Sequence, residues 1–354
     1  MSRTWLKWMP AIAVPVLIAS AAVAVPLSAN AAVNLPTKSP TQVLALAAGA
    51  KVTALSGTIS QTSSLGLPAL PTTGADASAG SALELLTGSH TARVFVDGST
   101  RQRVQVLDRM AERDLVRNGS DLWLYDSKKK SAVHSTLADR GASTPPTEGS
   151  IPTPDQLAAK LLASVDPSTI ISLGSDLRVA GRTAYDLILT PKASQTLMGS
   201  VSIAVDSETG LPLSVEVFAR SQETPAFSIG YSKLDLGAPD AALFAFTPPA
   251  GAKVTEKALK SDAARPAPAK SEGSKPSVSG TGWDAIVALP AASLMSGTGT
   301  SSATSSPLFG KLTTAVTGGH LFHTSLVNVF LTDDGRVFAG SVPVAKLQAA
   351  AAQK

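Results

Sequence analysis

The feature that most constrains the fold is a series of segments in which apolar and polar residues alternate. Four such segments lie between Tyr185 and Tyr231, and each turns its large apolar side chains to one side only. Successive side chains of a β-strand point to opposite faces, so this period of two predicts strands with one apolar face. A sheet of this kind must be covered on that face by helices, by a ligand, or by both.

The same alternation occurs earlier in the chain, in segments separated by short turns. The dipeptides 97–98 (Asp-Gly) and 118–119 (Asn-Gly) are typical of tight turns, and the charged run 126–130 predicts a further one. This spacing predicts an antiparallel meander. Two helices are expected as well, over 39–51 and 154–165, where a capping residue precedes a proline and a one-sided apolar pattern.

The apolar positions of these strands form the candidate set of ligand-binding, groove-lining residues. They are Val94, Val96, Val104, Val106, Tyr185, Leu187, Leu189, Val201, Ile203, Val205, Val215, Val217, Phe227, Ile229 and Tyr231. Alternation is first of all a packing pattern, and an ordinary dry core explains it equally well. The residues alone therefore leave core and groove both open.

The N-terminus has the features of a secretory signal over residues 1–31. Arg3 and Lys7 precede the apolar stretch 11–27, and small residues follow at 29–31. We therefore expect an extracytoplasmic protein, secreted or held in the cell envelope, whose signal is either cleaved or retained as a membrane anchor. The chain contains no cysteine, which excludes disulfides and the cysteine-linked lipid of bacterial lipoproteins.

The sequence contains no recognisable catalytic or metal-binding motif. G-x-S-x-G, G-x-G-x-x-G and P-loop patterns are absent. Ser127 and Lys130 have S-x-x-K spacing within a lysine-rich turn, while His320 and His323 have no evident third ligand. We expect a non-enzymatic protein with no metal site and no cofactor. The net charge of +4 is too small to indicate a nucleic-acid partner.

Changes in composition divide the chain into four parts. The signal 1–31 is followed by the alternating domain 32–255, which includes a Pro/Gly-rich loop at 65–81. A basic Pro/Ala/Ser-rich linker is expected over 256–280. The C-terminal extension 281–354 is expected to contain a short helix at 283–289 and a hairpin around Asp333-Asp334-Gly335, which either joins the main sheet or packs with that helix.

Four motifs, in order along 39–255, resemble those of the LolA family of lipid and lipoprotein carriers. Residues 118–130 are similar to its "G-x-x-(L/V)-W-x-Y-(D/N)…K" hairpin, and 179–187 to the strand after its central helix. Residues 205–213 resemble its "D-x-x-T-G-L-P" turn, and 244–254 its closing "F-x-F-x-P-P-x-G-x-x-V" segment. The RseB-type regulators and the mycobacterial glycolipid-carrier lipoproteins belong to the same superfamily.

The resemblance implies an α+β fold: a curved, half-open antiparallel β-barrel of about eleven strands, with helices covering its concave face. It also implies a cell-envelope carrier that binds lipid or lipoprotein acyl chains in an apolar groove, with a membrane protein as donor or acceptor. The alternative is an RseB-like regulator that binds an anti-sigma factor or another membrane-protein ectodomain. An RseB-type protein has a second folded domain after a linker, whereas 281–354 predicts little more than one hairpin, which favours the carrier.

Overall fold

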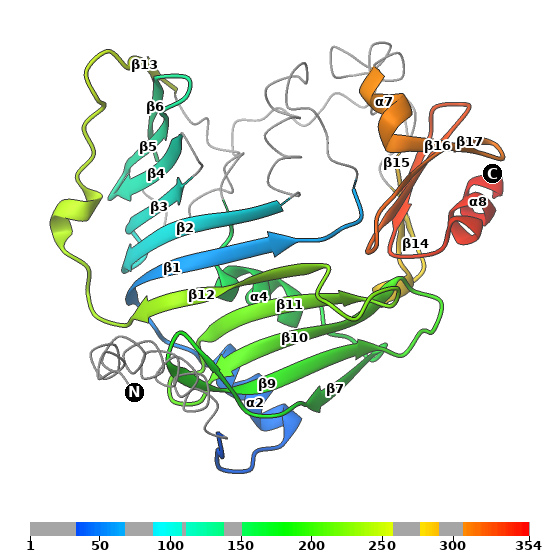
Figure 1. Cartoon of the computed structure of the whole chain (residues 1–354), viewed down its shortest axis with the longest axis horizontal. Coiled ribbons are helices and arrows are strands. Elements are labelled where there is room, and N and C mark those ends of the chain that lie inside the picture. The colour runs from blue at the N-terminus through cyan, green and yellow to red at the C-terminus, as the bar shows by residue number, and fades with distance from the viewer. Residues whose placement is uncertain are drawn as a thin grey trace, which may run out of the picture. The chain divides into compact units, whose positions relative to one another are not determined.

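The computed structural model describes residues 33–67, 88–107, 111–137, 151–257, 277–289 and 307–353. The expected signal at 1–31, most of the 65–81 loop and most of the 256–280 linker lie outside these residues. The described part is mostly β, with two sheets and few helices (Figure 1). Within it, no helix is both long enough and apolar enough to cross a membrane.

The first sheet has 13 strands. Their order is β13-β6-β5-β4-β3-β2-β1-β12-β11-β10-β9-β7, with β8 paired to β9. The bounds are β1 (Ala54–Ser63), β2 (Gly88–Asp97), β3 (Arg101–Leu107), β4 (Glu112–Asn118), β5 (Asp121–Asp126), β6 (Ser131–Thr136), β7 (Thr169–Leu173), β8 (Leu177–Val179), β9 (Arg182–Pro191), β10 (Met198–Asp206), β11 (Pro212–Ala219), β12 (Phe227–Asp235) and β13 (Lys253–Glu256).

The predicted meander is present, and its turns fall where the sequence indicated. In the β4–β5 hairpin Asn118 pairs with Asp121, so the loop is two residues long. Gly119 in this loop has φ +64°, a conformation that glycine adopts without steric cost. Asp97 pairs with Arg101 at the preceding turn.

The expectation of about eleven strands, all antiparallel, is wrong in two respects, because the sheet has 13 strands and one of its pairs is parallel. The sheet is mixed, because β13 pairs with β6 in parallel. Lys253 N–H donates to Lys130 O and Lys257 N–H to His134 O, both over 2.8 Å. All four residues of β13 are exposed. Because none of them has to be apolar, the sequence shows no alternation here from which a strand could be predicted.

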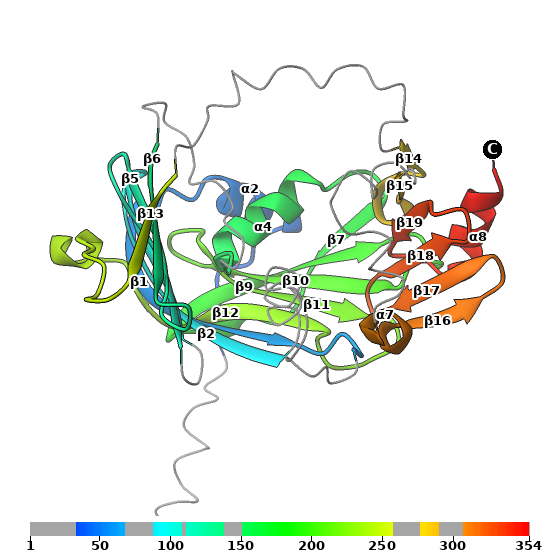
Figure 2. The same ribbon diagram turned by 90° about the horizontal axis from the view of Figure 1, so that it is seen from above.

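Two helices, α2 (Pro40–Ala48) and α4 (Pro154–Ala163), pack on one face of the first sheet. In Figures 1 and 2 both lie on the same side of β9–β12. Beneath them the apolar face of the strands forms the core: Leu187, Ile203 and Val215 have no exposed surface. The alternation is thus satisfied by packing of helix on sheet.

The C-terminal region forms a second sheet of six strands, ordered β14-β15-β19-β18-β17-β16. Its elements are β14 (Ser277–Ser279), β15 (Ile286–Leu289), α7 (Pro307–Leu312), β16 (Thr313–Val316), β17 (Gly319–His323), β18 (Asn328–Thr332), β19 (Val337–Gly340) and α8 (Val344–Ala352). The β18–β19 hairpin is the one predicted around Asp333-Asp334-Gly335. It pairs with β15 and not with the first sheet.

The predicted helix at 283–289 is wrong. A 3-10 turn spans Gly282–Asp284, and Ile286–Leu289 are strand β15. Pairing of Ile286 with Gly340 and of Ala288 with Phe338 overrides the local preference, because this segment lies between β14 and β19 in the sheet and buries Ile286. Ser277–Ser279, within the expected linker, form β14.

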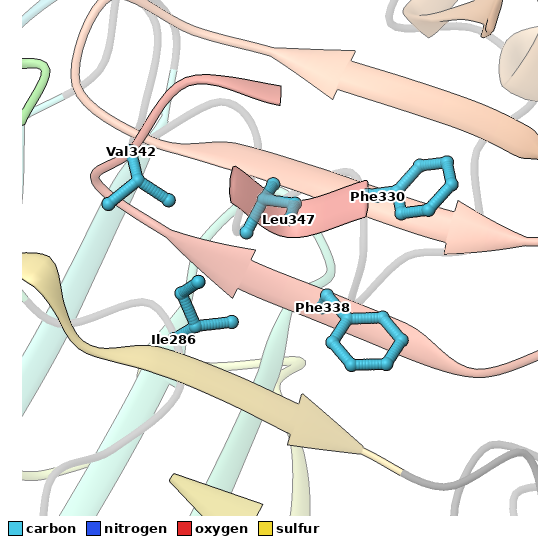
Figure 3. Close-up of a cluster of buried hydrophobic side chains, with 5 residues drawn as sticks. All are labelled: Ile286, Phe330, Phe338, Val342 and Leu347. Carbon is cyan, nitrogen blue, oxygen red and sulfur yellow. The ribbon is translucent and has the colours of Figure 1, made fainter. Parts of the chain in front are cut away.

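A separate hydrophobic core holds the second sheet together (Figure 3). It consists of five buried side chains from three strands, a loop and helix α8: Ile286, Phe330, Phe338, Val342 and Leu347. Val342 and Leu347 have no exposed surface. Residues 277–289 and 307–353 therefore have the core that a small folded unit requires.

Candidate functional site

The candidate site begins with the two helices, whose N-termini are capped in the same way. Ser39 Oγ accepts the N–H of Gln42 and the Gln42 side chain accepts the N–H of Ser39. Thr153 and Gln156 form the same capping box at α4. Capping satisfies backbone donors that the helix itself leaves free, so both helices begin at fixed residues.

An apolar cleft of about 610 Å³ lies between these helices and the start of β11. We call it the helix cleft. It is lined by Leu44, Ala47, Ala48, Ala50, Val52, Asp155, Ala159, Leu162, Ala163, Leu211 and Pro212. Small alanines face the space from both helices, and Asp155 is its one carboxylate. Such a cavity suits an apolar ligand or an apolar side chain of a partner.

The turn between β10 and β11 places Leu211 and Pro212 at the helix cleft. Gly210 has φ +77°, and a Cβ built on it would lie 2.2 Å from the carbonyl oxygen of Leu46 in α2. Only glycine allows the turn to approach the helix backbone this closely. The "T-G-L-P" part of the motif at 205–213 thus positions α2 against the sheet.

Asp206 holds this turn in shape. Its side chain is 1% exposed and accepts hydrogen bonds from Arg182 Nε at 2.6 Å and from the Thr209 N–H at 2.8 Å. Burial alone raises the pKa of a carboxyl group, but the hydrogen bonds from Arg182 and Thr209 hold the pKa of Asp206 below its usual range. Arg182 also pairs with the exposed Glu208 at 2.7 Å.

A polar contact at the helix cleft joins α4 to the sheet. Tyr231 Oη on β12 donates to Asp155 Oδ1 in the first turn of α4 at 3.2 Å. Burial raises the pKa of Tyr231, with a further contribution from the charge of Asp155, so the hydroxyl stays protonated and can donate. This contact gives a defined orientation to the carboxylate that lines the cleft.

The sequence-predicted groove residues lie on one face of the first sheet and outside the lining of the helix cleft, which Tyr231 reaches through its hydrogen bond to Asp155. Twelve of the fifteen are buried at 8% exposure or less, and Val96, Val104 and Phe227 are half-buried. None of them lines the helix cleft. On β9–β12 they pack in the core, and their contact with a ligand stays a prediction.

Sequence reasoning missed the residues that line the helix cleft. The signal was present in part, because 205–213 was recognised as a motif and both helices were located. The alanines of α2 and α4 carry no pattern of their own, so only the crossing of the helices over the sheet brings them together.

The weaker candidates take structural roles. Ser127 Oγ accepts the backbone N–H of Glu112 at 2.7 Å, within the turn after β5. His320 and His323 lie three apart on strand β17, so their side chains point to opposite faces. Asp334 accepts a hydrogen bond from Arg336 Nε at 2.8 Å in the hairpin turn. In the described part of the chain, no three metal-binding side chains of the His, Cys, Asp or Glu type come together.

Comparison with known proteins gives structural matches only: no family model and no curated protein matches the sequence. The structure of the MucA/MucB complex of Pseudomonas aeruginosa matches with 18% identity and a TM-score of 0.42, covering 88% of this chain and 96% of that one. A LolA superfamily protein of Nitrosomonas europaea matches with 12% identity and a TM-score of 0.26, covering 59% of this chain and 99% of that one.

The fold is similar to those of MucB and of LolA superfamily proteins. An uncharacterised conserved protein of Thermus thermophilus matches too, with 12% identity and a TM-score of 0.35 over 61% of this chain and 98% of that one. The four motifs predicted a likeness to LolA-type and RseB-type proteins, and structures of both kinds are among the matches.

Proposed function

We propose that this chain is an extracytoplasmic, non-enzymatic regulatory protein that binds the exported segment of a membrane protein, as RseB-type proteins do. The observation that carries the proposal is the second sheet with its own hydrophobic core. A second folded domain is the feature that separates an RseB-type protein from a simple carrier. The sequence had favoured the carrier because it indicated only one hairpin there.

Contacts between the two sheets support a single two-part binding protein. Thr196 Oγ1 and Leu197 N–H both donate to the carbonyl of Ser341, over 2.7 and 2.8 Å. Trp283 Nε1 donates to Thr169 Oγ1 at 2.8 Å. Partly buried hydrogen bonds of this kind attach the second sheet to the first at defined residues.

The packed apolar face beneath the helices also supports the regulator proposal. Leu187, Leu189, Val201 and Ile203 have no exposed surface, so the described apolar face of β9 and β10 leaves no room for cargo unless the helices move. A partner that binds outside this core needs no such movement. The MucB structures include complexes with MucA; the partner proposed here is of that kind, an anti-sigma factor or another membrane-protein ectodomain.

Cross-linking in intact cells tests the regulator proposal. The tagged full chain is expected to capture one membrane protein with an exported segment in near-equal amount. The Leu347→Ala variant, which opens a cavity in the second core, should lose that capture at temperatures where its second sheet is unfolded. Equal capture by both proteins there, or no membrane protein enriched over an untagged control, would contradict the proposal.

A lipid carrier is the second candidate, and the helix cleft is the observation that favours it. Each methylene buried in such a space contributes about 0.8 kcal/mol, so a few acyl carbons give useful, reversible binding. In this candidate the first sheet is the half-open barrel of the carriers and the acyl chains occupy the cleft between its helices and β11.

Lipid binding has a direct test with a matched control. Ala159 is exposed and lines the helix cleft, so Ala159→Trp should fill the cleft and abolish uptake of a fluorescent fatty acid. Ala238→Trp, on an exposed loop away from the cleft, should leave uptake unchanged. No uptake by the unmodified protein, together with no lipid in its native mass spectrum, would remove the carrier candidate.

A further inference from the structure

A cluster of polar and aromatic side chains sits where the chain leaves the first sheet. β13 is the last strand of that sheet, and the next described residue after Lys257 is Ser277 at the start of the second sheet. His134, on the neighbouring strand β6, bridges two carboxylates. Its Nε2 lies 2.9 Å from Asp121 Oδ1 on β5, and its Nδ1 lies 2.8 Å from Glu256 Oε2 on β13.

The protonation state of the ring decides whether both contacts are favourable. A neutral imidazole has one N–H donor and one acceptor nitrogen, so only one carboxylate can receive a hydrogen bond. The other then faces a lone pair. An imidazolium donates to both carboxylates and carries the charge that offsets theirs. The geometry therefore fits the protonated ring best.

The surroundings of the ring reinforce this preference. Trp123 on β5 stacks on His134 with ring centroids 4.3 Å apart and an interplanar angle of 22°, an arrangement that favours a cation over the indole face. Among the described residues, the charged side chains that contact His134 are Asp121 and Glu256. Although burial disfavours the charged form, hydrogen bonds to these two raise the pKa of His134 above its ordinary value.

The strand that His134 holds is weakly attached by other means. β13 has four residues, all exposed, and pairs in parallel with a single neighbour. A short edge strand without buried side chains detaches from its sheet at a low free-energy cost. One added contact therefore changes the fraction of molecules in which the strand is attached. The chain before β13 is anchored independently, because Phe244 is buried and Phe246 packs against Trp123. Detachment can therefore be confined to β13.

We propose that His134 is a pH-dependent latch that fastens β13, and with it the connection to the second sheet, to the edge of the first sheet. A protonated His134 holds the strand. Loss of the proton releases it, which frees the edge of β6 and lengthens the connection by about 14 Å for four extended residues. The latch does not depend on which partner the protein binds.

The direction of the effect follows from the raised pKa. Attachment is complete below the ordinary histidine pKa of about 6.5 and is lost as the pH rises through the higher pKa of the folded protein.

Hydrogen exchange of the full chain, measured by mass spectrometry between pH 5.5 and 9, tests the latch. After correction for the intrinsic rate, peptides covering 253–257 should exchange about three- to fivefold faster at the high end, since one charge-assisted contact of an exposed pair contributes up to about 1 kcal/mol, which corresponds to a factor of about five. Glu256→Gln should exchange fast at every pH. Glu208→Gln, an equally exposed carboxylate paired with Arg182, serves as the control and should behave as the unmodified protein.

An NMR titration of the four histidine rings, with His134 assigned from a His134→Asn variant, gives the second measurement. The pKa of His134 should fall in Glu256→Gln and again in Asp121→Asn. The proposal is overturned if exchange at 253–257 has the same pH dependence in Glu256→Gln as in the unmodified protein, or if neither variant moves the titration of His134.

Discussion

Replacement of Asp206 by asparagine is expected to lower the free energy of unfolding by about 3 to 5 kcal/mol, the range for breaking a buried ion pair from one side. The change keeps the shape of the side chain and removes its charge. It leaves the guanidinium of Arg182, which is 24% exposed, without its buried partner. It also replaces the carboxylate oxygen that accepts both the N–H and the hydroxyl of Thr209.

The magnitude follows from the number and kind of contacts. Hydrogen bonds to a charged group contribute about 1.5 to 3 kcal/mol each when buried, but contacts within one network do not add. Two contacts from Arg182, at 2.6 and 2.9 Å, and two from Thr209 share one carboxylate that is 1% exposed. The carboxylate and its partners therefore act as one unit, whose loss costs about 3 to 5 kcal/mol.

Urea denaturation followed by far-UV circular dichroism measures the effect, with Glu208→Gln as matched control. Glu208 also pairs with Arg182 but is 76% exposed, so its loss should cost less than about 1 kcal/mol. The pKa of Asp206 is lowered in the folded protein, so its contribution is present above the unfolded pKa of about 3.9 and is lost as the pH falls through the folded pKa. The difference between Asp206→Asn and the unmodified protein should shrink below about pH 4.

The result that refutes this reasoning is a small loss for Asp206→Asn, equal to that of Glu208→Gln at pH 7. It would mean that the turn is held by the backbone hydrogen bonds of 206–211 and that the buried carboxylate is dispensable. An unchanged difference at low pH would show that the charge has no part in the effect.

Three further changes test other parts of the fold. Gly210→Ala should cost about 1 to 2 kcal/mol in backbone strain and speed hydrogen exchange in α2, because its Cβ meets Leu46 O; unchanged exchange would contradict this. Leu347→Ala should cost about 2 to 5 kcal/mol and speed exchange in β18 and β19 but not in β10, whereas an equal rise in both sheets would show one shared core. Thr153→Ala should lower stability by about 1 kcal/mol in urea denaturation, and no loss would mean that the α4 cap is unimportant.

The local elements of the first sheet were predictable because their signals are local. Alternation in 185–231 gave the strands, a two-residue turn at Gly119 gave a hairpin, and Ser39 and Thr153 gave the starts of both helices. Each depends on side chains within a few residues of one another, which is the range over which sequence patterns carry information.

The second sheet and β13 were not predictable in this way. β14 and β13 are short and wholly exposed, so no alternation distinguishes them from a linker. Ile286–Leu289 resembles a short helix in isolation and becomes a strand because β14 and β19 pair on either side of it. Pairing between segments distant in the sequence supplies the hydrogen bonds of these strands and buries Ile286. Local residue preferences contain no information about such pairing.

For the candidate site, the sequence by itself determined the helices, the apolar strand faces and the motif around Gly210. Whether that apolar face is a groove or a core was decided only by the tertiary structure. The helices cover the apolar face of β9–β12. The open space is the helix cleft, which lies beside that face and is lined by alanines and by Pro212. The physical reason is that an alternating pattern specifies which side chains must leave water, and it does not specify what takes the place of the water.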